Sequence, residues 1–343
     1  METTCFLGAC STEGFVSHFD TLYRETEELT VLKGGCGCGK STFLRAVADA
    51  ARKHGMDTEL VLCSSDPSSL DGVLFDGRAY VDGTAPHIFE PQICGGRMNY
   101  LNFGAFYDRA AMRAAEEPLY RLRRENAACY TRVTDALAAA RGLLASPARE
   151  ARALEQSLGA IAECLALSAF RSPGTEGVER RRFLCALTPR GACFGDVAHA
   201  YRRVIVLRDA YVLAPVLLRT LVQRARENRQ SVVLGYGPMQ PTGSPAHLLL
   251  PDAGVAVLSE SEELAYDGPC CCRIDLVSSV PMRLRDALRF QVETVALLLR
   301  RCVEEIARAK AIHDEMEALC RPFIDFDAVT AQTERELLRI FTK

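Results

Sequence analysis

A glycine-rich stretch within residues 31–45 ends in a lysine followed by two hydroxyl residues. Gly34, Gly39, Lys40 and Ser41 fill the pattern G-x-x-x-x-G-K-[ST], in which small residues let backbone N–H groups surround a phosphate. In this pattern the lysine reaches the β- and γ-phosphate oxygens, and the serine hydroxyl can bind Mg²⁺. The expected cofactor-binding residues are Gly34, Gly35, Cys36, Gly37, Cys38, Gly39, Lys40, Ser41 and Thr42.

The elements on either side of this stretch suit that chemistry. Residues 28–33 are predicted to form a short buried strand, and residues 42–52 are predicted to form a helix. Strand, loop and helix in this order are the context in which the pattern binds a nucleotide, because the helix directs its positive end at the anion. The sequence has no Asn-Lys-x-Asp motif for reading guanine, so we expect ATP with Mg²⁺ as the cofactor.

A carboxylate that helps to hold the metal is expected at the end of a neighbouring strand. Asp82 follows the apolar residues 79–81 and is our candidate; its alternative role is to cap the turn that follows. We expect Ser41 and Asp82 as the metal ligands, and Lys40, Asp66 and Asp82 as the catalytic residues.

Residues 63–72 are expected to form a polar loop after a second strand, at the edge of the sheet where ligands bind. Asp66 could accept a proton from an attacking hydroxyl or orient a water there, or it could merely shape an Asp-Pro turn with its serine neighbours. Weaker candidates in the same loop are Ser64, Ser65 and Asp71.

Other polar residues have two open interpretations. His87 could sense the γ-phosphate or be a structural histidine beside a proline. One of several arginines on a predicted helix could reach the nucleotide, although a solvated helix face explains them equally well. These arginines are Arg109, Arg113, Arg121, Arg123 and Arg124.

The chain also contains an internal duplication. The matched segments are 6–14 with 183–191, 29–33 with 203–208, 43–45 with 217–219, 60–62 with 232–234, and 78–81 with 255–257. In the second copy the loop reads Asp-Ala-Tyr-Val-Leu-Ala-Pro over residues 209–215, and Leu258 stands where the first copy has Asp82. The second copy is therefore expected to be a pseudo-site.

The predicted fold class is α/β, with duplicated P-loop NTPase-type parallel-sheet cores that are each followed by a helical arm. We expect a break between helices at Ser146-Pro147 and a long helical pattern over 281–319 that ends at Arg321-Pro322. A short helix is expected over 328–341. The predicted domains are a core at 1–100, a helical arm at 101–170, a linker at 171–180, a degenerate core at 181–280 and a C-terminal arm at 281–343.

Composition narrows the class of protein. The 343 residues are 48% hydrophobic and 25% charged, with a net charge of −3, which is typical of a globular protein and does not call for nucleic acid or a membrane as partner. Neither an apolar run long enough to span a membrane nor a signal peptide is recognisable, so we expect a cytoplasmic protein.

The 15 cysteines are an odd number in a large chain without an export signal, which favours reduced thiols over a disulfide framework. The cluster Cys270–Cys272 lacks the paired spacing of a zinc site. Oxidation of Cys36 or Cys38 within the glycine-rich stretch would be expected to block nucleotide binding.

Three stretches together resemble a group of bacterial tandem P-loop proteins described as ATPases or nucleotide-kinase-like proteins. The stretches are 6–15, 32–42, and 63–73 leading to 81–87, and the similarity covers most of residues 5–92. This chain departs from the family in having Cys36 and Cys38 where the family has proline and threonine, and in lacking the second phosphate loop. The resemblance implies ATP binding more than any particular substrate.

Three functions are compatible with these residues. In the first, the chain is an Mg-ATP hydrolase in which Lys40 stabilises charge, Ser41 and Asp82 hold the metal, and Asp66 orients water. In the second, it is a nucleotide or small-molecule kinase in which Asp66 acts as the base toward an acceptor, and the absence of a Glu after Asp82 favours this function. In the third, it is an ATP-dependent switch whose helical arms bind a protein partner.

Overall fold

The computed structural model describes residues 1–170, 173–174 and 177–342. The chain divides into two compact units that are interleaved along the sequence. Unit 1 comprises residues 1–8, 17–132 and 305–343, and unit 2 comprises residues 9–16 and 133–304. Each unit contains a six-stranded sheet, so the expected duplicated α/β architecture is confirmed at this level. The division into five domain segments remains a prediction.

The sheet of unit 1 has the strand order β1-β5-β6-β7-β4-β8. The predicted strand over 28–33 is confirmed as β4, whose central residues are buried because a central strand is covered on both faces. The strands are β1 (Glu2–Cys5), β4 (Glu28–Lys33), β5 (Thr58–Cys63), β6 (Asp66–Phe75), β7 (Arg78–Asp82) and β8 (Met98–Asn102).

The sheet of unit 2 repeats this arrangement strand for strand. Its order, β9-β13-β14-β15-β12-β16, has the same sequence of parallel and antiparallel pairings. The strands are β9 (Glu179–Phe183), β12 (Arg203–Arg208), β13 (Val232–Tyr236), β14 (His247–Leu250), β15 (Val255–Glu260) and β16 (Cys272–Asp275). A two-stranded sheet accompanies each copy, formed by β2 (Gly8–Ser11) with β3 (Gly14–Ser17) and by β10 (Cys185–Thr188) with β11 (Gly191–Phe194).

The expectation of purely parallel sheets is wrong. One strand in each sheet, β6 in unit 1 and β14 in unit 2, runs antiparallel to both of its neighbours. The stretch expected as a loop over 63–72 is mostly this strand β6. The reason is the short connections between β5, β6 and β7, because antiparallel neighbours need only a tight turn whereas a parallel pair needs a long crossover.

The sheet registers also correct one aligned pair. Asp82 lies opposite Leu32 in the pairing of β7 with β4, and Ser259 lies opposite Leu207 in the equivalent pairing of β15 with β12. The residue equivalent to Asp82 is therefore Ser259 rather than Leu258. A carboxylate is still missing at this position of the second copy.

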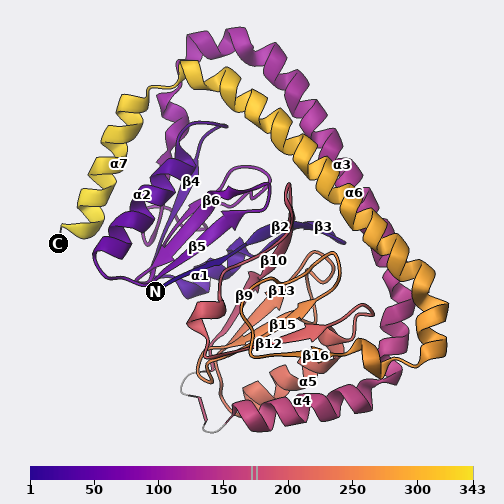
Figure 1. Cartoon of the computed structure of the whole chain (residues 1–343). Helices are drawn as coiled ribbons and strands as arrows, with labels where there is room; N and C mark the ends of the chain where they lie inside the picture. Colours follow the sequence, from indigo (N-terminus) through magenta and orange to yellow (C-terminus); the bar gives the residue numbers. More distant parts are fainter. Residues whose placement is uncertain (171–172, 175–176, 343) are drawn as a thin grey trace. The chain divides into compact units, whose positions relative to one another are not determined.

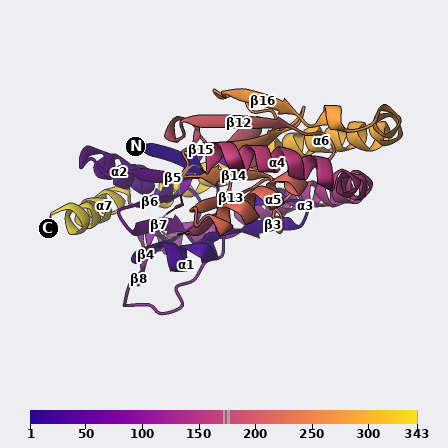
Figure 2. The same cartoon turned by 90° about the horizontal axis from the view of Figure 1, so that it is seen from below.

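Each copy has one helix between equivalent strands. The predicted helix of the first copy is confirmed as α2 (Lys40–Lys53), and its counterpart is α5 (Ala214–Glu227). The buried side chains of α2 recur at helical spacing and pack on the sheet together with α7 (Phe326–Phe341), which lies beside α2 in both views (Figures 1 and 2). The buried side chains of this core include Leu32, Phe43, Leu44, Val47, Val73, Tyr80 and Phe103.

Long helices follow each core. They are α3 (Arg109–Ala153) with α4 (Glu155–Ala169) after the first core and α6 (Met282–Cys320) after the second, and a short α1 (Leu22–Glu25) precedes β4. The patterns expected over 281–319 and 328–341 are confirmed as α6 and α7. The break expected at Ser146-Pro147 is wrong, because α3 continues through it and the interruption falls at Leu154. A proline in a helix can be accommodated as a bend instead of an end.

Within unit 1, the parts of α3 and α6 that belong to it lie side by side and run in opposite directions. Leu122 and Cys129 of α3 pack with Ala309 and Ile312 of α6, and the Asn126 side chain donates to the Ala309 carbonyl at 2.8 Å. These contacts fix the end of α6 in unit 1. The predicted linker over 171–180 falls partly on 171–172 and 175–176, outside the described residues, and its last two residues begin β9.

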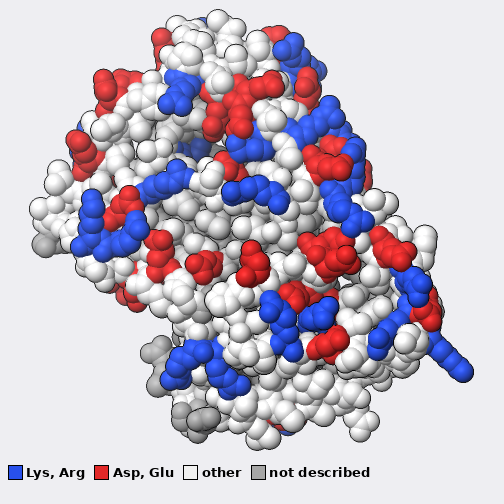
Figure 3. Space-filling view, in the orientation of Figure 1, with Lys and Arg blue, Asp and Glu red and all other residues white. Residues whose placement is uncertain are grey.

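Acidic and basic side chains are interspersed on the face drawn in Figure 3. Among the described residues, none of the helices combines the length and apolar character that a membrane crossing requires. The expected cytoplasmic location remains a prediction.

Candidate functional site

The glycine-rich loop, residues 34–39, connects the end of β4 to the first residue of α2. Gly39 has φ 91°, in the left-handed region that glycine adopts without a steric penalty, and it precedes the first helical residue. A Cβ atom on Gly34 would lie 2.7 Å from the Cys38 sulfur, so the loop closes tightly on itself there. The first N–H groups of α2 have no acceptor within the helix, which makes this end of α2 suited to an anion.

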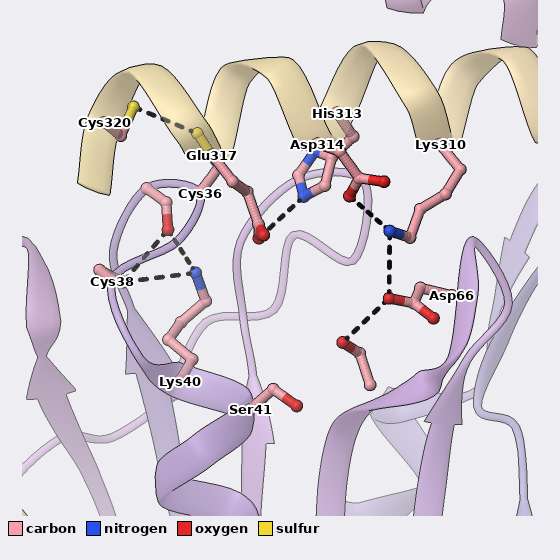
Figure 4. Close-up of polar contacts among 12 residues, drawn as sticks. Cys36, Cys38, Lys40, Ser41, Asp66, Lys310, His313, Asp314, Glu317 and Cys320 are labelled. Atoms are coloured by element: carbon pink, nitrogen blue, oxygen red, sulfur yellow. Dashed lines mark hydrogen bonds and ion pairs between the residues drawn. The ribbon is translucent and has the colours of Figure 1, made fainter. Parts of the chain in front are cut away.

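Lys40 lies along the inside of this loop (Figure 4). Its Nζ donates to the carbonyl oxygens of Gly34 at 2.9 Å and Gly35 at 2.8 Å. The same atom lies 3.6 Å from Asp82 Oδ2, and both side chains are largely buried. Two of the three oxygen partners of this ammonium are therefore neutral carbonyls, which an anionic ligand could replace with stronger, charged acceptors.

The two expected metal ligands come from neighbouring elements. β4 and β7 are adjacent and parallel, so the start of α2 and Asp82 lie at the same edge of the sheet. Asp82 Oδ1 accepts from the Thr84 N–H and hydroxyl at 2.8 and 2.6 Å, so the turn-capping role is real, while Oδ2 faces Lys40. Ser41 Oγ accepts from the Leu70 N–H at 3.0 Å and keeps a lone pair.

Ser41 and Asp82 fit an Mg²⁺ ion that binds together with a nucleotide, and they do not form a complete metal site by themselves. Mg²⁺ in nucleotide sites takes one or two protein oxygens, and the other ligands come from phosphates and water. Ser41 and Asp82 would supply those two oxygens. In the part of the chain that is described, no group of three or more His, Cys, Asp or Glu side chains could hold a metal, and this includes the Cys270–Cys272 cluster.

Asp66 lies at the start of β6, across from the start of α2 (Figure 4). Its Oδ1 accepts from the Ser68 N–H, and its Oδ2 lies 3.4 Å from Lys310 Nζ on α6. Burial acts to raise the pKa of Asp66, but the hydrogen bonds from Ser68 and the charge of Lys310 outweigh it and the pKa is lowered. A carboxylate in this state orients a donor well but is a weak base at neutral pH.

His87 is a buried partner of Asp71. Its Nε2 lies 3.0 Å from Asp71 Oδ2, and both side chains are less than a tenth exposed. Burial acts to lower the pKa of His87, but the charge and hydrogen bond of Asp71, with a contribution from Asp82, outweigh it and the pKa is raised. This geometry favours the structural interpretation of His87. Among the described residues, the hydrogen bonds and ion pairs of the glycine-rich loop involve other side chains than the arginines on α3 that the sequence singled out.

The end of α6 supplies residues that the sequence did not indicate (Figure 4). Glu317 packs against Gly37, so that a Cβ atom on Gly37 would lie 3.5 Å from the Cβ of Glu317. His313 contacts the Glu317 carboxylate at 3.4 Å. The pKa of Glu317 is lowered by His313 in the first place, and further by Lys310 and by the Gly37 backbone N–H. A carboxylate therefore faces an amide of the glycine-rich loop.

Two more contacts tie this loop to its surroundings. The Tyr107 hydroxyl donates to the Cys36 carbonyl at 2.6 Å, and burial raises the pKa of Tyr107 strongly. The Cys36 and Cys320 sulfurs lie 3.5 Å apart, and all 15 cysteines are free thiols. More than 200 residues separate Cys36, Gly37 and Asp66 from their partners on α6, and a local sequence pattern carries no signal for such contacts.

In unit 2 the equivalent position is filled by the chain itself. Asp209 accepts from the backbone N–H groups of Tyr211 at 2.9 Å and Ala214 at 2.8 Å, at the start of α5. Burial raises its pKa, while these backbone donors act in the opposite direction. An internal carboxylate thus accepts hydrogen bonds at the start of α5, where the first copy has the glycine-rich loop. The pseudo-site remains a prediction.

Comparison with known proteins gives no match: no family model fits the chain, and no curated protein or solved structure is significantly similar to it. The resemblance to tandem P-loop proteins therefore remains a prediction from residues 5–92.

Proposed function

We propose that unit 1 binds Mg-ATP in the glycine-rich loop and hydrolyses it, and that unit 2 carries a pseudo-site. The observation that carries this proposal is the position of Lys40. Its ammonium lies inside a loop of small residues at the start of a helix, in contact with the Gly34 and Gly35 carbonyls and 3.6 Å from Asp82. A polyphosphate would exchange these weak neutral acceptors for charged oxygens, and hydrogen bonds to charged groups are the stronger ones.

Each residue has a definite role in this proposal. Lys40 and the N–H groups at the start of α2 stabilise negative charge on the phosphates. Ser41 and Asp82 would hold Mg²⁺, and the ion would supply positive charge beside the phosphates. Asp66 stays ionised because its pKa is lowered, so it orients a water through a hydrogen bond and does not remove a proton in the ground state.

A second candidate function is an ATP-dependent switch. It is favoured by the packing of Glu317 on Gly37, because a helix in contact with a nucleotide loop is placed to respond to its occupancy. In that case a protein partner, and not an acceptor metabolite, would change the turnover. The kinase function predicts ADP formation only in the presence of an acceptor.

The test compares wild type with Lys40→Ala and with the matched control Lys53→Ala, which removes an exposed lysine from the other end of the same helix. Loss of a charge-assisted contact of about 1.5–3 kcal/mol should weaken Mg-ATP binding by about 10–100-fold in Lys40→Ala and leave Lys53→Ala unchanged. Binding is measured by calorimetric titration, and ADP and free phosphate are measured together. Equal affinity in all three proteins would refute the proposal.

A further inference from the structure

Two cysteines from opposite ends of the chain meet beside the glycine-rich loop. Cys36 lies in the loop and Cys320 is the last residue of α6, and their sulfurs face each other at 3.5 Å (Figure 4). A disulfide has an S–S length of about 2.05 Å, so the two sulfurs must approach by only about 1.5 Å to form the bond. Cys36 is partly exposed, whereas Cys320 is 2% exposed, so a small oxidant reaches Cys36 first.

We propose that Cys36 and Cys320 are a redox-sensitive thiol pair, and that their oxidation to a disulfide joins the glycine-rich loop to α6 and blocks nucleotide binding. The effect on binding rests on the proposed function, whereas formation of the disulfide does not. The oxidant we name is hydrogen peroxide.

The chemistry balances in two steps. The Cys36 thiol loses its proton, its thiolate attacks one peroxide oxygen, and the O–O bond breaks; the hydroxide that leaves takes up the proton, so the products are a Cys36 sulfenic acid and water. The Cys320 thiol then loses its proton, its thiolate attacks the Cys36 sulfur to form the S–S bond, and the S–O bond breaks; the hydroxide that leaves takes up this proton to give a second water. Two thiols lose two protons and two electrons in total, and one peroxide takes them up.

The location of the bond explains why it would block the loop. One helical turn before Cys320, Glu317 lies against Gly37, and the Gly37 N–H faces its carboxylate. A covalent link at Cys36 holds this turn of α6 against the loop, so a negative carboxylate stays where a phosphate would approach the amides. Reduction of the disulfide lets Glu317 move away again.

Neighbouring thiols do not offer an equivalent pair. The Cys38 thiol donates to the Gly35 carbonyl at 3.1 Å and lies 3.7 Å from Lys40 Nζ, and no sulfur–sulfur contact of Cys38 accompanies these among the described residues. Burial and the neighbouring Cys320 raise the pKa of Cys36 to about 12, so little thiolate exists at neutral pH. The rate of disulfide formation should therefore rise about tenfold per pH unit below that pKa.

The test treats the purified full chain with hydrogen peroxide at pH 7.5 and 8.5, alkylates the remaining thiols, and quantifies the Cys36–Cys320 cross-linked peptide by mass spectrometry. Binding of a fluorescent ATP analogue with Mg²⁺ is measured on the same samples before and after reduction with dithiothreitol. The matched variants are Cys320→Ala and the control Cys164→Ala, which changes an exposed cysteine on α4. Cys320→Ser is a second variant at the buried position, and circular dichroism confirms that each variant folds.

We expect the cross-link in wild type and Cys164→Ala, a loss of affinity of at least about tenfold on oxidation, and full recovery on reduction. Cys320→Ala should form no cross-link, and oxidant should leave its Cys36 as a sulfenic acid or a more oxidised form that mass spectrometry distinguishes from the disulfide. Absence of the cross-link at pH 8.5, after an exposure long enough to oxidise a thiol with the raised pKa of Cys36, overturns the proposal, and so does a cross-linked protein that binds nucleotide as well as the reduced one. If the reduced wild type does not bind nucleotide, the proposed function fails, and with it the proposed block of nucleotide binding. The mass-spectrometric measurement then still decides whether Cys36 and Cys320 form a disulfide.

Discussion

Replacing Glu317 with glutamine tests whether α6 opposes an anion in the glycine-rich loop. The Glu317 carboxylate faces the Gly37 N–H, and its lowered pKa keeps it ionised at neutral pH. A phosphate that used the same N–H would lie within about 4 Å of this carboxylate, where two unit charges repel by about 4 kcal/mol at an effective dielectric of 20 and by about 1 kcal/mol in water. The side chain is 45% exposed, so we take a repulsion of about 1–2 kcal/mol.

Glu317→Gln should therefore bind Mg-ATP about 5–30-fold more tightly than wild type. The matched control is Glu315→Gln, which removes an exposed carboxylate from the same helix and should leave the dissociation constant unchanged. The measurement is a titration at 50 mM and 500 mM salt, and the difference between wild type and Glu317→Gln should shrink at the higher salt. Equal affinities of wild type and Glu317→Gln, or an equal gain in Glu315→Gln, would contradict the electrostatic reasoning.

Two further predictions concern buried polar contacts that support the first sheet. Because Asp71 raises the pKa of His87 above its ordinary value of about 6.5, the pair stabilises the fold below that pH and the stabilisation is lost as the pH rises through the raised pKa. The unfolding temperature of wild type relative to His87→Gln should therefore fall between pH 6 and pH 9, and a constant difference would show that the pair does not titrate on unfolding. The Tyr80 hydroxyl donates at 2.8 Å to the buried Glu336 carboxylate on α7, so Tyr80→Phe should lower the free energy of unfolding by about 1–3 kcal/mol in a urea titration. The exposed Tyr120→Phe is its control, and equal losses in the two variants would contradict a specific role for this hydrogen bond.

Local patterns predicted the elements around the candidate site well. The apolar run at 28–33 and the helical spacing after Lys40 place β4 and α2 within about two residues of their observed bounds, because burial and helix periodicity are properties of neighbouring residues. The position of Asp82 could be predicted for the same reason. A residue at the carboxyl end of a buried parallel strand lies at the edge of the sheet where the loop after β4 and the start of α2 also lie.

The prediction for Asp66 shows where that reasoning ends. Its polar neighbours suggested a loop, but the pairing of β6 with β5 and β7 places it at the start of an antiparallel strand. A stretch with mixed polar and apolar residues forms a strand only where neighbouring strands pair with it. The residues of the stretch itself do not show whether such neighbours exist.

The sequence by itself determined the glycine-rich pattern with Lys40 and Ser41, the α/β class, and the presence of two related copies, because residue types and their order within short segments carry these features. The order of the strands and the antiparallel direction of β6 and β14 came from the structure. Only the tertiary structure brought the end of α6 to that loop, with Glu317 facing Gly37 and Cys320 facing Cys36. These contacts join residues that are 280 and 284 positions apart, and they follow from the packing of whole helices, which no short pattern of residues encodes.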